Sequence, residues 1–172
     1  MNYERMEEIT EEIKAFKMPR YDELPWINLY LEQLIDEVVY ILKPVFGDNS
    51  DRWITGTMIG NYVKMDLLPR PVGKKYSKEH IAYLVYISIA KQALSMGEIK
   101  RLLEIQKKAY PIEAAYDYLC IEFENVLHSI FERQEVCPPS YSVTDIEADV
   151  FRSTVISVGY SIYTRKMLEI YE

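Results

Sequence analysis

The sequence predicts an all-α protein, and three observations support that fold class. Apolar residues recur every three or four positions along most of the chain, which is the spacing that lines one face of an α-helix. Helix-capping residues and prolines separate these segments. The alternation of apolar and polar residues that is typical of strands is weak throughout, so the sequence allows only a small β-hairpin near residues 72–76. We therefore expect a series of helices, of which the last two are long and form a hairpin.

The first fifty residues predict two helices separated by a break. One face of the first helix carries Met6, Ile9, Ile13 and Phe16. The stretch MPRYDELP then interrupts the pattern with two prolines. A second amphipathic helix is expected from Trp26 to about Leu42, with Pro25 in its first turn and Pro44 and Gly47 closing it. Its apolar face holds Ile27, Leu31, Leu34, Ile35, Val38 and Leu42.

Residues 51–108 predict three further helices around a proline-bounded loop. Thr55 is a suitable N-cap for a short helix that reaches about Met65, and Pro69 and Pro71 force an extended segment after it. Ser77 can cap a helix from residue 78 to about 92. The sequence from Ser95 to Glu98 is a capping box that opens the next helix. The inward positions of the last two helices are Ile81, Leu84, Val85, Ile89, Ile99, Leu102 and Leu103.

Residues 109–172 predict two long helices, at about 112–134 and 144–170, separated by the turn CPPSYS. The segment is rich in aromatic residues, which we expect to fill a helical core. Dimerisation through these helices and a pocket for an unknown small-molecule effector remain open alternatives. The chain thus divides into N-terminal helices at 1–50, a central domain at 51–108 and a helical hairpin at 109–172.

Charge is distributed unevenly along the chain. The total is −7, whereas residues 51–108 carry 11 basic and 5 acidic groups, a net charge of +6. The flanking segments have net charges of −6 and −7. A localised basic segment in an acidic protein is typical of a chain with an anionic partner. A solvated helix face would produce the same bias, so charge alone does not decide the function.

Several classes of function find no support in the sequence. Cys120 and Cys137 form neither a disulfide framework nor a zinc clamp. His80 and His128 are isolated from any nucleophile motif, and no glycine-rich phosphate loop is present. The sequence also lacks a signal peptide and an apolar run long enough to span a membrane. We expect a cytoplasmic protein without enzymatic activity, cofactor or metal.

The short helix after Thr55 has two different faces. Ile59, Tyr62 and Val63 lie on the side that a core would cover, so Tyr62 should support the helix from within. The opposite side carries a polar stripe of Thr57, Gly60, Asn61 and Lys64. An amide can pair with an adenine edge in the major groove, and a lysine can reach guanine or phosphate. Glycine lets a phosphate backbone approach closely. A solvent-facing stripe without function is the alternative.

The loop that follows this helix is basic. Arg70 precedes Lys74, Lys75 and Tyr76, which form a compact group suited to phosphate contacts. A polar helix beside a basic hairpin is a coherent DNA-binding unit, in which phosphate contacts fix the register and base contacts specify the sequence. The stretch from 55 to 76 is therefore interpreted as a recognition helix followed by a wing.

These pieces resemble the winged helix-turn-helix of the mercury-resistance-regulator (MerR) superfamily, over about residues 54–104. In that superfamily a helix with a tyrosine leads into a Gly-Leu-Leu-Pro turn and a basic wing ending in Tyr-Ser. The matching pieces are Tyr62, Leu67-Leu68-Pro69, Lys74, Tyr76-Ser77 and Ile99-Lys100-Arg101-Leu102-Leu103. Three positions depart from the pattern. Gly60 stands where an arginine is usual, Asp66 replaces the turn glycine, and Lys74 replaces the wing arginine.

The same stretch is also similar to an uncharacterised family of bacterial proteins with an Asn-Tyr-Val-Lys helix, a Leu-Pro turn and a Lys-Lys-Tyr-Ser wing. Together these resemblances imply a transcriptional regulator that binds double-stranded DNA as a homodimer. The expected DNA-binding residues are Thr57, Gly60, Asn61, Tyr62, Lys64, Arg70, Lys74, Lys75 and Tyr76. The alternative is a non-enzymatic protein–protein interaction module built on a helix-turn-helix scaffold.

Overall fold

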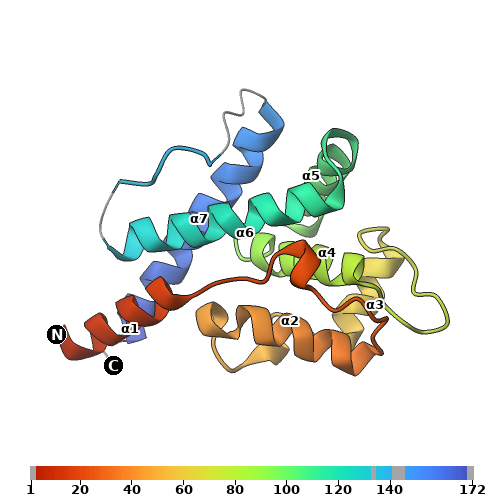
Figure 1. The fold of residues 1–172 in the computed structure, drawn as a ribbon, viewed down its shortest axis with the longest axis horizontal. Coiled ribbons are helices and arrows are strands. Elements are labelled where there is room, and N and C mark those ends of the chain that lie inside the picture. Colours follow the sequence, from red (N-terminus) through yellow and green to blue (C-terminus); the bar gives the residue numbers. More distant parts are fainter. Residues whose placement is uncertain (1–2, 133–134, 141–145, 170–172) are drawn as a thin grey trace.

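The computed structural model describes residues 3–132, 135–140 and 146–169, and its elements are helices (Figure 1). This confirms the all-α class. Two short 3-10 helices, η1 (Tyr21–Glu23) and η2 (Ser50–Arg52), accompany the α-helices. The α-helices are α1 (Tyr3–Ala15), α2 (Leu31–Phe46), α3 (Gly56–Lys64), α4 (Lys78–Ala90), α5 (Met96–Ala109), α6 (Ile112–Phe131) and α7 (Ile146–Glu169).

Helix α4 is the centre of the fold. Every side chain from His80 to Ala90 is buried, so this helix has no solvent-facing side. Helices α2, α6 and α7 all pack against it. A helix that is apolar all round belongs in the interior of a protein. One hydrophobic core therefore runs from Ile9 near the N-terminus to Ile162 in α7.

The segment between α1 and η1 is attached to α6 by carboxylates. Glu124 is 2% exposed and accepts two hydrogen bonds from Arg20, at 2.8 and 3.0 Å. Its two oxygens also accept from the backbone N–H of Met18 and from Lys17. Burial alone would raise the pKa of Glu124, but these donors hold it below its usual value. These hydrogen bonds and ion pairs thus fix the segment between α1 and η1 to helix α6.

Helices α6 and α7 pack closely but run in the same general direction, so the predicted antiparallel hairpin is wrong. Tyr118 contacts Phe151 and Phe131 contacts Tyr163, because the connection first returns along α6 from Ser129 to Glu122. At Gly159 of α7, an added Cβ would lie 2.7 Å from a methyl group of Val126 and 3.0 Å from Ile130. The chain before α7 is also tied to α6. Buried Glu122 accepts from Arg152 at 2.9 Å and from the backbone of Ser140 at 2.7 Å. The turn CPPSYS lies partly outside the described residues.

Two predicted boundaries of α2 are wrong. The helix begins at Leu31 instead of Trp26, and Trp26 and Ile27 are exposed. The reason is a long-range one, because Leu29 pairs with Tyr76 through its backbone and cannot be helical at the same time. At the other end, α2 continues through Pro44 to Phe46. Gly47, at a φ of 81°, then closes it by donating to the carbonyl of Lys43 at 2.8 Å.

Helix α3 and the loop 65–77 lie at the same end of the molecule, away from α1 (Figure 1). The described residues contain no strand in this loop, only two isolated antiparallel bridges, Val72 with Lys75 and Leu29 with Tyr76. Two paired positions are too few to make a ladder. The loop therefore contains a tight turn and is hydrogen-bonded to the segment before α2.

Candidate nucleic-acid interface

Helix α3 separates its residues into a buried and an exposed side. The hydroxyl of Thr55 accepts a hydrogen bond from the backbone of Met58 at 3.2 Å, which confirms the predicted N-cap. Ile59 and Tyr62 are buried. The four polar-stripe residues are all exposed, namely Thr57, Gly60, Asn61 and Lys64. A Cβ added at Gly60 would meet nothing within 4 Å, so the middle of this stripe is flat and open.

Tyr62 supports α3 from the inner side, as its position on the helix predicts. It is 6% exposed, and its hydroxyl accepts from Lys91 at 3.3 Å. The same ammonium donates to the backbone carbonyl of Trp53 at 3.0 Å. Burial lowers the pKa of Lys91 and raises that of Tyr62. The Tyr62 hydroxyl thus contributes to the anchor of α3 and does not extend the exposed stripe.

The turn after α3 is clamped by His80. The backbone N–H groups of Leu67 and Leu68 donate back to the carbonyl of Tyr62, at 2.9 and 3.4 Å. The Nδ1 atom of His80 accepts from the backbone of Ser77 at 3.0 Å, so Nε2 carries the proton and donates to the carbonyl of Pro69 at 3.2 Å. Burial lowers the pKa of His80, although these backbone bonds and Glu79 oppose the shift. His80 is therefore neutral and stabilises this turn through its hydrogen bonds to Ser77 and Pro69.

The basic loop ends in a two-residue hairpin turn. Val72 and Lys75 exchange two backbone hydrogen bonds, of 3.1 and 3.0 Å. Between them Gly73 and Lys74 have φ values of 58° and 61°. Two central residues at positive φ are the signature of a type I′ turn, for which Asn-Gly is preferred. A lysine at this position is strained, which is a common feature of functional residues.

The extended segment before α2 joins this surface, which the sequence did not indicate. The backbones of Leu29 and Tyr76 exchange two hydrogen bonds of 2.8 Å. The ammonium of Lys75 lies 5.1 Å from the ring centre of Tyr30. Tyr76 itself is 9% exposed and packs edge-on against His80. The buried side chain of Tyr76 is therefore not available to a partner, and this residue can contribute to an interface only through its backbone. Trp26, which lies on the same segment, is 89% exposed.

The candidate cations on this surface are free of carboxylates. Lys64, Arg70, Lys74 and Lys75 are all exposed, and within the described ranges none makes an ion pair. The described ion pairs of the acidic flanking segments lie elsewhere, as that of Glu124 with Arg20 does. The acid within the turn itself is Asp66, exposed and at a φ of 59°.

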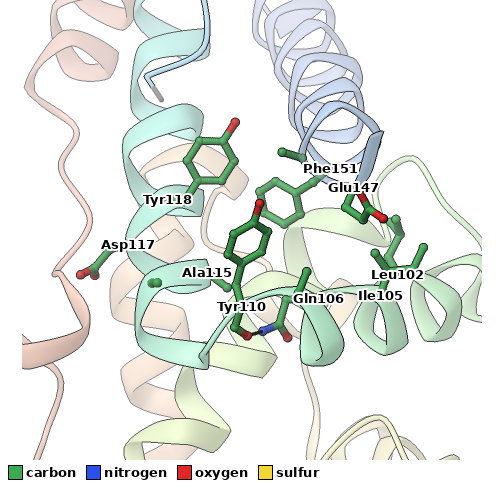
Figure 2. Close-up of a pocket in the computed structure, with 12 residues that line it drawn as sticks. Leu102, Ile105, Gln106, Tyr110, Ala115, Asp117, Tyr118, Glu147 and Phe151 are labelled. Atoms are coloured by element: carbon green, nitrogen blue, oxygen red, sulfur yellow. Dashed lines mark hydrogen bonds between the residues drawn. The ribbon is translucent and has the colours of Figure 1, made fainter. Parts of the chain in front are cut away.

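A separate apolar cavity of about 440 Å³ lies between α5, α6 and α7 (Figure 2). The side chains of Tyr110, Tyr118 and Phe151 converge on it, and Leu102 and Ile105 close the opposite side. Asp117 points away from these rings, because it accepts from the backbone of Tyr21 at 2.7 Å. The lining is mainly apolar, and apart from Asp117 its charged residue is Glu147 of α7.

Other classes of site find no support in the described part of the chain. No group of three or more histidine, cysteine, aspartate or glutamate side chains is placed to hold a metal ion there. Cys120 is buried, Cys137 is exposed, and both are free thiols. None of the described helices combines the length and apolar character that crossing a membrane requires.

The fold defines an all-α protein with an exposed polar helix beside a basic turn. The chain belongs to the DUF1836 family, a domain of unknown function whose model matches residues 19–119. This agrees with the predicted likeness to an uncharacterised family. The match begins before η1 and ends within α6, so it includes both α3 and the segment that pairs with the basic turn. No curated protein and no solved structure matches the chain significantly.

Proposed function

We propose that this protein is a cytoplasmic, non-enzymatic regulator of transcription that binds double-stranded DNA. In this proposal α3 is the recognition helix of a MerR-like winged helix-turn-helix, and residues 69–76 form a minimal wing. The observation that carries the proposal is the exposed, flat polar stripe of α3 beside cations that have no described carboxylate partner. A cluster of exposed cations in an acidic protein creates a local positive potential that attracts an anionic partner.

Each exposed residue has a separate task in this proposal. Asn61 would pair with an adenine edge and Lys64 would reach guanine or phosphate, while Thr57 would contact a base or the backbone. Gly60 would let the DNA backbone approach α3. The phosphate contacts would come from Arg70, Lys74 and Lys75, with Tyr62 and Tyr76 holding the two elements in place.

A homodimer is part of the same proposal. Helix α7 carries four exposed apolar side chains, Ile146, Val150, Tyr160 and Leu168. Exposed apolar residues on a long helix favour contact with a second copy. Two-fold symmetry would match a palindromic operator. The apolar cavity between α5, α6 and α7 would then be the place for an unknown effector.

A protein–protein interaction module is the second candidate, and one observation favours it. Trp26, Ile27, Tyr30 and Val72 are exposed at 89%, 50%, 57% and 83%, and they lie on the two segments that the Leu29–Tyr76 bridge joins. Aromatic and aliphatic side chains of this kind are enriched at protein interfaces. Acidic peptides would be the preferred partners, because the neighbouring cations are unpaired.

Selection from a pool of random duplex DNA, followed by affinity measurements over a range of salt concentrations, tests the first candidate. We expect an enriched palindrome and an affinity that falls steeply with salt, with the slope reduced by about 2 in Lys74→Ala/Lys75→Ala. The matched control is Lys107→Ala/Lys108→Ala, which also removes two neighbouring lysines, one of them 5.0 Å from a tyrosine ring.

Two results of this selection would contradict the proposal. An enriched motif bound equally well by both double mutants would remove the wing from the proposal. Absence of binding even at low salt would overturn DNA recognition altogether and favour the interaction module.

A further inference from the structure

A second cavity, of about 400 Å³, lies where α2, η2 and α7 meet. We call it the cationic cavity, because three positively charged side chains line it: Arg52, Arg165 and Lys166. The rings of Phe46 and Trp53 also line it, and they pack edge-to-face with centroids 5.6 Å apart. The lining therefore combines cationic with aromatic side chains.

The three cations have no anionic partner among the side chains that the structure describes. The guanidinium of Arg165 donates to the side-chain oxygen of Gln92 at 2.9 Å, which orients it without neutralising it. Lys166 contributes weakly to the lowered pKa of Asp48, but the main cause is Lys43, which binds that carboxylate at 2.7 Å. The described carboxylate of this region is thus already paired.

Trp53 brings an aromatic ring to the cavity but no hydrogen-bond donor. It is 4% exposed, and its indole Nε1 is buried without a described hydrogen-bond partner, so this N–H does not face the open cavity. The charged groups that a ligand can reach are therefore the three cations, and their charge indicates an anion.

We propose that the cationic cavity binds a small organic anion, a phosphate ester or carboxylate attached to a compact apolar group. The two arginines suit bidentate pairing with such an anion, while Phe46 and Trp53 suit its apolar part. This site is distinct from the surface of α3, although the backbone carbonyl of Trp53 is held by the same Lys91 that contacts Tyr62.

The test uses the indole resonances in ¹H–¹⁵N spectra of the full chain without DNA, so its result is independent of the proposed function. The protein has two tryptophans, and Trp26→Phe leaves only the Trp53 signal. Phenyl phosphate is titrated as the probe, with inorganic phosphate supplying the charge alone and benzyl alcohol the apolar group alone. We expect a saturable shift of the Trp53 resonance, with phenyl phosphate binding most tightly.

Two variants separate this site from general anion binding. Arg52→Gln/Arg165→Gln should weaken binding of phenyl phosphate by about tenfold or more. Lys107→Gln/Lys108→Gln, which removes the same charge from α5, should leave it unchanged. An unmoved Trp53 resonance at the highest soluble probe concentration, or equal binding by both double mutants, would overturn the proposal.

Discussion

Lys74 occupies a backbone conformation that suits glycine better than lysine. Its φ of 61° lies in the left-handed region, at the second position of the tight turn between Val72 and Lys75. For a residue with a side chain this region costs on the order of 1 kcal/mol. The turn nevertheless places an unpaired ammonium at the apex of the basic loop. The turn thus has a lower local stability than a glycine at this position would give, but it places a positive charge at its apex.

The substitution Lys74→Gly separates these two effects. We expect the free energy of unfolding to rise by up to about 1 kcal/mol, because glycine removes the strain but enlarges the unfolded ensemble. Affinity for duplex DNA should fall, with the salt slope reduced by about 1. Urea denaturation and salt-dependent binding measure the two quantities. Unchanged DNA affinity in Lys74→Gly and in Lys74→Asn would show that this charge makes no phosphate contact.

His80 makes the stability of the basic turn dependent on pH. Its pKa is lowered from the ordinary value of 6.5, so below pH 6.5 the unfolded chain takes up a proton that the folded chain resists. The free energy of unfolding should therefore fall as pH drops from 6.5 towards the folded pKa, with a slope no steeper than about 1.4 kcal/mol per pH unit. Protonation would also remove the bond from Ser77 to Nδ1.

Urea denaturation between pH 7.5 and 5.5 measures this dependence in the native protein and in His80→Gln. We expect the variant to be less stable at neutral pH and to lose part of the slope. Identical slopes in both proteins would show that other groups cause the pH dependence.

At the scale of whole elements, the contact between α6 and α7 depends on Gly159. Alanine is favoured over glycine in a helix by about 1 kcal/mol, so propensity alone predicts that Gly159→Ala stabilises the protein. A methyl group 2.7 Å from Val126 instead forces the helices apart, which costs about 1–3 kcal/mol. We expect a net loss of about 1 kcal/mol or more, measured by urea denaturation.

Gly60→Ala is the matched control, because its Cβ would meet nothing within 4 Å. This variant should gain stability by up to about 1 kcal/mol. The pair Gly159→Ala/Val126→Ala should be more stable than the two single effects predict, since the smaller side chain makes room for the methyl group. Equal stability changes in Gly60→Ala and Gly159→Ala would contradict the close packing of α6 and α7.

Local signals were sufficient to predict most helices and the caps of two of them. The N-cap of α3 and the capping box that opens α5 involve residues three positions apart, and both form. The hydroxyls of Thr55 and Ser95 accept from backbone N–H groups, and the N–H of Ser95 donates to the carboxylate of Glu98. The predicted start of α2 was wrong because it depends on a contact with a residue far away in the sequence. Its apolar pattern continues back to Trp26, but the bridge from Leu29 to the distant Tyr76 keeps the residues before Leu31 out of the helix.

At the scale of the whole molecule, the interiors and cavities could not be predicted from the sequence. The sequence placed four inward residues on α4, but three packed helices bury every side. The cationic cavity joins residues from α2, η2 and α7 that are far apart in the chain. The exposed stripe of α3 was predictable because it depends on one helix, whereas the partners of Arg20 and Lys91 depend on tertiary packing.

Helix α4 holds the two candidate DNA-binding elements from its opposite ends. At its start His80 binds the carbonyl of Pro69, and directly after its last turn Lys91 binds Trp53 and Tyr62. Contacts at both ends of one buried helix therefore fix the position of α3 relative to the turn. Such a unit tolerates drift in side-chain chemistry but little change in chain length. Insertions and deletions during evolution should be excluded between Trp53 and Lys91 and concentrated in the connection from α6 to α7.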